Sequence, residues 1–226
     1  MDGLAAFWQT LVAPASAAVV QGAQTLELPT LLALAAALGW ASGLRLYAVL
    51  FMVGLAGLMG WMPLPHGLQV LQHPALLAAS GSMLFVEFFA DKIPGLDSLW
   101  DMVHAVIRVP GGAALAAAVF GADNATMAVV AGVLGGSLAA TSYAGKATTR
   151  AAVNTSPEPF SNVAVSLLED GLVVAALWLA VQHPLVFAIA LTLTLVLTVL
   201  LIAVLFKFLR AIVRRLAAWF KPSPAY

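Results

Sequence analysis

The chain alternates between long apolar stretches and short segments rich in proline, glycine and charged residues. Crossing a bilayer takes about 20 apolar residues of helix, and six stretches have about that length. They lie at residues 31–60, 74–91, 97–120, 126–148, 162–181 and 184–208. The pattern predicts an all-α polytopic membrane protein with about six transmembrane helices.

Two of these stretches contain residues that break or bend helices. The first is long enough to be tilted or broken around Gly39 and Gly43, and the third is interrupted by the Pro-Gly-Gly at 110–112. Broken helices within a membrane often border a binding cavity. We therefore expect broken or re-entrant elements among the spans.

The composition agrees with a membrane location. Hydrophobic residues make up 62% of the 226 residues, mean hydropathy is +1.00 and only 9% are charged, against about 25% in soluble domains. The absence of cysteine excludes disulfides, thiolate metal sites and cysteine nucleophiles. No nucleic-acid signature or soluble-enzyme motif is found. We divide the chain into an interfacial or flexible segment at 1–30, a transmembrane domain at 31–208 and a basic amphipathic cytoplasmic tail at 209–226.

Lysine and arginine are distributed unevenly between the two sides of the predicted membrane domain. The loops near 61–73, 121–125 and 182–183 contain neither residue type. Because cytoplasmic loops are enriched in Lys and Arg, this distribution predicts that both termini are cytoplasmic. Arg45 alone lies inside the first stretch, where it could snorkel, pair with an acidic group or face a cavity.

Two stretches of the chain resemble each other. LGWASGLRLYA at 38–48 and LGGSLAATSYA at 134–144 share Leu-Gly and Tyr-Ala at the same spacing. They fall in the first and fourth spans, which cross in opposite directions, so a three-plus-three inverted repeat is one interpretation. A competing match of Gln-His-Pro at 72–74 and 182–184 does not fit that register.

A first polar cluster follows the second span. Glu87 and Asp91 are four residues apart and share a helix face, and the Ile-Pro-Gly at 93–95 then ends that helix. A narrow stripe on the next helix consists of Asp97, Asp101, His104 and Arg108. Two groups of acidic side chains are therefore expected to meet at a cytoplasmic hairpin.

A second polar cluster lies on the same predicted side, around the Ser-Pro-Glu-Pro at 156–159 that contains Glu158. The residues before it recur every four positions, and those after it share a face of the next helix. They are Lys146, Arg150 and Asn154 before the break, and Asn162, Ser166, Glu169 and Asp170 after it. Because water is scarce at the depth of Glu169 and Asp170, each needs a partner.

The two clusters carry chemistry that a plain membrane anchor does not need. Carboxylates and an imidazole can ligate a divalent cation, for which Asp97, Asp101, His104 and Glu169 are the candidate ligands. The same groups can relay protons. The alternative is that Lys92, Arg108, Lys146 or Arg150 neutralises them in ion pairs that join helices.

Three motifs resemble an uncharacterised bacterial family of small integral membrane proteins that is defined by a domain of unknown function. They are GLRLYAVL at 43–50, EFFADKIPGLDSLWDMVHAVIRVPGGA at 87–113 and NTSPEPFSN at 154–162. The resemblance implies a bacterial inner (plasma) membrane location and makes both polar clusters family hallmarks. It carries no substrate, reaction or cofactor.

Three functions remain open from the sequence. The leading hypothesis is a small transporter or channel that moves a cation, a proton or a small metabolite through the polar site. The first alternative is a membrane enzyme that acts on lipid head groups or isoprenoid diphosphates with a divalent metal. The second is a structural or assembly protein. The expected partners are the lipid bilayer and a small ion or metabolite, with a homo-oligomer as a further possibility.

Overall fold

The computed structural model describes residues 26–93, 95–122, 124–154 and 159–219, and these parts of the chain are helical, with no strand among them. The all-α prediction is confirmed. The elements are α2 (Leu28–Leu58), η1 (His66–Gln72), α3 (Pro74–Ala90), α4 (Leu96–Phe120), α5 (Ala125–Val153), α6 (Pro159–Gln182) and α7 (Pro184–Trp219).

Prolines mark where several of these helices begin. Pro29 lies in the first turn of α2, and Pro74 and Pro184 are the first residues of α3 and α7. A proline fits there because the first amides of a helix have no partner within it. Within the described part of the chain, five helices are long and apolar enough to cross a membrane, and η1 with α3, bent by 71°, forms a candidate for a sixth span. The chain is therefore a polytopic membrane protein.

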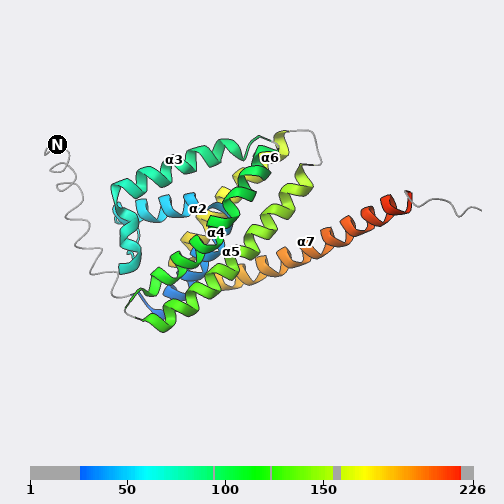
Figure 1. The fold of residues 1–226 in the computed structure, drawn as a ribbon. Coiled ribbons are helices and arrows are strands. Elements are labelled where there is room, and N and C mark those ends of the chain that lie inside the picture. Colours follow the sequence, from blue (N-terminus) through cyan, green and yellow to red (C-terminus); the bar gives the residue numbers. More distant parts are fainter. Residues whose placement is uncertain (1–25, 94, 123, 155–158, 220–226) are drawn as a thin grey trace, which may run out of the picture.

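The helix α2 breaks at Arg45, whose backbone leaves helical geometry (φ −149°, ψ 81°). Both parts of α2 run from Arg45 toward the same end of the bundle. The first residue, Leu28, lines a cavity of about 910 Å³ together with His66, which follows the second part, and with Phe120 at the end of α4. In Figure 1 the start of α2 lies near the start of α5, and its second part lies beside α3.

This break changes the topology expected from the sequence. The predicted break near Gly39 and Gly43 occurs two residues later, and α2 turns back instead of crossing. As a result, the loop after α2 lies at the same end as Leu28, whereas a straight first span would have put it at the opposite end. We call this the far end. The end where α3 finishes and α4 begins is the charged end.

Glycines bring α2, α4 and α5 into close contact. A Cβ on Gly39 would lie 2.5 Å from the Cα of Gly135, and one on Gly112 would lie 3.1 Å from the carbonyl oxygen of Gly39. The Pro-Gly-Gly at 110–112 does not interrupt α4, which continues through Pro110 to Phe120. Its glycines serve the packing of α4 against the other two helices.

The two similar stretches pack directly against each other. Ser142 Oγ donates to the carbonyl oxygen of Trp40 at 2.6 Å, and Lys146 Nζ donates to that of Leu44 at 3.1 Å. Later residues of α2 therefore meet later residues of α5, so the stretches run parallel. An inverted repeat would make equivalent helices run in opposite directions. The inverted-repeat interpretation is therefore wrong for this pair of helices.

The last helix, α7, runs from the far end toward the charged end and continues beyond it. Phe187 near its start is buried, and Thr198 lies against Gly145 of α5. With 36 residues, α7 is about 54 Å long, whereas the apolar core of a bilayer is about 30 Å thick. Its final part leaves the bundle in Figure 1, and Lys207, Arg210 and Arg214 are exposed there.

A buried charge cluster at one end of the bundle

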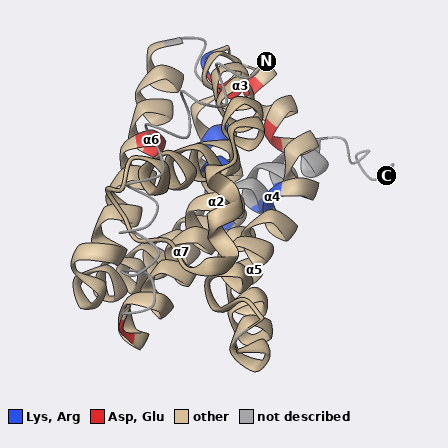
Figure 2. Ribbon diagram, turned by 90° about the vertical axis from the view of Figure 1, so that its left-hand side faces the viewer, with Lys and Arg blue, Asp and Glu red and all other residues tan. Residues whose placement is uncertain are grey.

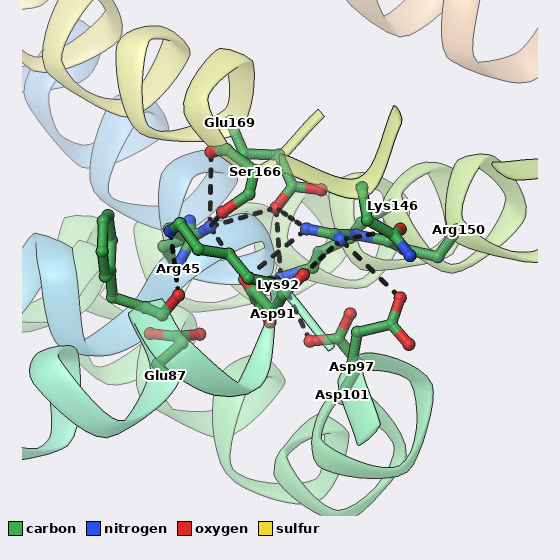
Figure 3. Close-up of polar contacts among 12 residues, drawn as sticks. Arg45, Glu87, Asp91, Lys92, Asp97, Asp101, Lys146, Arg150, Ser166 and Glu169 are labelled. Carbon is green, nitrogen blue, oxygen red and sulfur yellow. Dashed lines mark hydrogen bonds and ion pairs between the residues drawn. The ribbon is translucent and has the colours of Figure 1, made fainter. Parts of the chain in front are cut away.

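Ten charged side chains from five helices or their ends meet at the charged end. The buried charge cluster consists of Arg45, Glu87, Asp91, Asp97, Asp101, Arg108, Lys146, Arg150, Glu169 and Asp170. Figure 2 shows charged positions where α2, α3, α4 and α6 approach one another, in a ribbon that is otherwise mostly tan. Figure 3 shows most of their contacts. The structure thus brings both predicted polar clusters together in one site.

Arg45 lies at the centre of this cluster. Its guanidinium is 2.8 Å from Asp91 and, through Nε, 2.8 Å from Asp170, and it is 3.6 Å from Glu169. It also donates to Ser166 Oγ at 2.7 Å. The break in α2 therefore places one arginine between the end of α3 and the middle of α6 (Figure 3).

A second arginine joins α3 to α4. Arg108 donates to Asp101 at 2.6 Å and to Glu87 at 2.5 Å, and neither Arg108 nor Glu87 is exposed. Asp101 and Arg108 are seven residues apart on one face of α4, as the stripe in the sequence predicted. This part of the site agrees with the ion-pair alternative drawn from the sequence.

Lys146 and Arg150 of α5 connect the two acidic groups. Lys146 Nζ lies 3.1 Å from Asp101, 3.3 Å from Glu169 and 3.4 Å from Asp91. Arg150 lies 3.1 Å from Glu169 and donates to the backbone carbonyl of Asp91 at 2.9 Å. The four-residue spacing of the two cations lets both reach the same carboxylate of α6.

Two asparagines extend the network toward the turn between α5 and α6. Asn154 donates to both oxygens of Asp97 at 3.0 and 3.1 Å, and Asn162 donates to Asn154 at 2.8 Å. Arg150 donates to Asn162 at 3.3 Å. Glu158, the remaining residue of the predicted site, lies outside the described residues.

The structure arranges the candidate metal ligands differently from a metal site. Lys146 lies between Asp101 and Glu169, so an ammonium group occupies the place where a cation would bind them. His104 stacks on Trp100 with ring centroids 4.0 Å apart, and its Nδ1 lies 2.9 Å from the carbonyl oxygen of that residue. Among the described residues, no group of three or more His, Asp or Glu side chains is arranged to hold a metal ion.

Lys92 has a different role from the one expected. Its ammonium donates to the carbonyl oxygen of Phe88 at 2.9 Å and lies over the ring of that residue. The four cations that pair with the buried carboxylates are Arg45, Arg108, Lys146 and Arg150. Sequence reasoning had named the last three as partners but left the role of Arg45 open.

The buried part of the cluster carries more acids than bases. Among the described residues, five acids of the cluster are 5% exposed or less, namely Glu87, Asp91, Asp97, Asp101 and Glu169, whereas the equally buried bases are the four just named. If all are ionised, one negative charge is uncompensated. Glu87 Oε2, Asp91 Oδ1 and Asp101 Oδ2 are buried without a hydrogen-bond partner. These oxygens can therefore accept a proton or a small cation.

The electrostatics of Asp91 follow from its position in the turn after α3. Burial by itself raises the pKa of its carboxyl, because a charged group loses hydration. The nearby cations Lys146, Arg45 and Arg150 lower that pKa by more, so it lies below its ordinary value. Asp91 is therefore ionised at neutral pH.

A comparison with protein families identifies the chain. The profile of a domain of unknown function, DUF4126, matches residues 32–204. The chain belongs to this family. The family match covers every residue of the buried charge cluster and confirms the predicted resemblance to a family defined by a domain of unknown function. No curated protein and no solved structure matches the chain significantly.

Proposed function

We propose that the protein is a small membrane transporter or channel that moves a proton, another cation or a small metabolite through the buried charge cluster. The observation that carries this proposal is the break of α2 at Arg45 inside that cluster. Membrane transporters bind substrates and coupling ions where broken helices expose backbone and charged groups. Helices that serve only as anchors have no need of such a break.

The charge balance favours a positively charged cargo or coupling ion. Five buried acids face four buried bases, and three carboxylate oxygens have unused acceptor capacity. Adding one proton or monovalent cation neutralises the buried part of the cluster. A cation bound by Asp91 would also compete with its ion pair to Arg45 and so loosen the contact that fixes the break in α2.

The positive residues support an orientation for this proposal. The exposed cations Lys207, Arg210 and Arg214 follow the charged end of the bundle, and the loops at the far end contain neither Lys nor Arg. The positive-inside rule then makes the charged end cytoplasmic. Because Leu28 lies at the far end, this orientation puts the start of α2 on the side opposite to the cytoplasm, which disagrees with a cytoplasmic location for the N-terminal side of the domain. Residues 1–25 and 220–226 lie outside the described residues, so the locations of the two termini themselves, and a bacterial inner membrane, remain predictions.

Flux measurements on the purified protein in liposomes test the proposal. We expect a proton or cation gradient to decay faster than in empty liposomes, with an internal pH dye and a panel of ions as readouts. Asp101→Asn should slow this decay by at least about tenfold, because positioned proton-transfer groups contribute on that scale or more. Glu27→Gln, which changes an exposed acid at the start of α2, is the matched control.

Two results would argue against transport. One is the absence of flux for protons, cations and small metabolites, together with no effect of Asp101→Asn in cells. The other is that exchanging Asp101 and Arg108 preserves both folding and cellular phenotype, because this outcome fits a purely structural role for their 2.6 Å ion pair.

A further inference from the structure

Two cavities lie along the second part of α2 and lead to the buried charge cluster. One, of about 370 Å³, is bounded by α2, α3 and α6 and ends at Asp170. The other, of about 360 Å³, lies between α2 and α6 and reaches Trp61 and Gln182 at the far end. Both are lined by Met52 and Val174, so they adjoin along the same trough. Each volume is within the range of about 300–1,000 Å³ typical of small-molecule sites.

The walls of this trough are apolar apart from Asp170 near one end and Gln182 at the other. Among the described residues, Asp170 is the only charged one that lines either cavity. Its side chain is 30% exposed, whereas the other carboxylates that pair with Arg45 are 7% exposed or less. A partly exposed carboxylate midway along a spanning helix is costly in an apolar surrounding. Asp170 therefore favours a positively charged group in the trough beside it.

Aromatic side chains give the trough a second means of attracting cations. Phe85 and Phe88 line the cavity that contains Asp170, and Trp61 and Trp178 line the other. The faces of these rings attract cations, tryptophan most strongly. Lys92 already lies over the ring of Phe88 in this structure. An apolar cation would therefore find aromatic contacts along the trough and a carboxylate at its end.

We propose that this trough binds a lipophilic organic cation, with the positive centre beside Asp170 and the apolar body against the aromatic walls. This inference rests on the proposed function in taking the bound cation as the transported substrate. The bound cation would compete with Arg45 for Asp170, whose carboxylate lies 2.8 Å from the guanidinium. Substrate entry from the apolar side would thus be linked to the break in α2.

Equilibrium binding to the full chain in detergent micelles tests this site. The probe is tetraphenylphosphonium, and tetraphenylborate provides the same shape with the opposite charge. We expect saturable binding of tetraphenylphosphonium and at least about tenfold weaker binding of tetraphenylborate. Asp170→Asn should weaken tetraphenylphosphonium binding by at least about tenfold, the scale for removing one desolvated charge partner. Glu27→Gln is the matched control and should bind normally.

A second variant tests the shape of the trough without changing its charge. Val174→Phe fills the region that both cavities share, whereas Val196→Phe enlarges an exposed valine of α7 that lines neither. We expect only Val174→Phe to lose binding. If Asp170→Asn does not fold, binding to Val174→Phe still tests whether the probe lies in the trough. Equal binding of both probes, or unchanged binding by the folded variants, would overturn the assignment.

Binding and flux separate this inference from the proposed function. Flux of protons without saturable binding of tetraphenylphosphonium would leave the transporter proposal in place and remove the trough as its substrate site. Saturable, Asp170-dependent binding without flux of any tested ion would preserve the site and remove transport. The two experiments use the same purified chain, so their outcomes can be compared directly.

Discussion

Replacing the arginine at the break of α2 should strongly destabilise the protein. In Arg45→Gln, the side chain stays polar but loses its charge. Asp91, 2.8 Å away and with no exposed side-chain surface, then loses one of its cations. Asp170 also loses its partner, but at 30% exposure it can be solvated in part.

The loss of stability in Arg45→Gln depends on whether the substitution acts mainly by removing a hydrogen bond or by leaving a buried charge uncompensated. A hydrogen bond between membrane helices contributes on average only about 0.6 kcal/mol. Breaking a buried ion pair by removing one partner costs about 3–5 kcal/mol, because a charge is left uncompensated. Arg45 and Asp91 are both fully buried, so the second estimate applies. We expect Arg45→Gln to lower the free energy of unfolding by about 3–5 kcal/mol.

The assay is unfolding in mixed micelles by titration with a denaturing detergent, followed by circular dichroism. Arg210→Gln, an exposed arginine of α7, is the control and should change stability by no more than about 0.5 kcal/mol. A double-mutant cycle that combines Arg45→Gln with Asp91→Asn should show a coupling energy of about 1–3 kcal/mol between the two substitutions. A loss below about 1 kcal/mol for Arg45→Gln, or strict additivity with Asp91→Asn, would refute the reasoning.

Three further predictions follow from the packing and the charges. A Cβ on Gly43 would lie 2.1 Å from a backbone oxygen of α5, so Gly43→Ala should lower the free energy of unfolding by at least about 1–3 kcal/mol. The control is Gly171→Ala, whose Cβ would meet nothing within 4 Å. In the same unfolding assay it should be neutral or stabilising. Because the pKa of Asp91 is lowered in the folded protein, its stabilising contribution is present above the unfolded pKa of about 4 and is lost as pH falls through the folded pKa. The unfolding curves of Asp91→Asn should lack this acid dependence. Arg108→Gln should lower the free energy of unfolding by about 3–5 kcal/mol, because it leaves the buried Glu87 without its cation. Adding Glu87→Gln to that variant should restore part of the lost stability. If stability is not restored, the 2.5 Å ion pair between Arg108 and Glu87 is unimportant.

The helices were predictable because their signals are local. Prolines at 74 and 184 begin helices where the apolar pattern placed them, and the acidic stripe on α4 faces Glu87 as its spacing indicated. The placement of both polar clusters on one side also followed from the order of the spans, but their meeting in one site did not. These inferences needed only helix periodicity and the cost of unpaired charge in a membrane.

The course of α2 was not predictable from the same signals. Its apolar pattern continues through Arg45, and a helix that turns back has the same hydropathy as one that crosses. The available signal was Arg45 itself, next to Gly43, inside an otherwise uncharged span. At Pro110 the sequence predicted an interruption, but α4 continues through it. Neighbouring helices can accommodate a proline within a membrane helix.

The metal-site hypothesis relied on residue types alone. Asp101 and Glu169 do lie near each other, but the sequence could not show that Lys146 would lie between them, 3.1 and 3.3 Å from their oxygens. His104 belongs to the same helix face as Asp101, yet its ring packs on Trp100. Which of several possible partners a charged side chain selects depends on how the helices pack.

The turn of α2 also sets an order for biogenesis. Arg45 forms contacts with Ser166, which is synthesised 121 residues later. An unpaired arginine in the middle of a membrane helix costs about 2.5–3.5 kcal/mol on insertion, and its acidic partners on α6 do not yet exist when α2 leaves the ribosome. The second part of α2 has only the residues from 46 to 58, too few to span a bilayer alone. The helix α2 therefore reaches its final position only after α6 has been inserted.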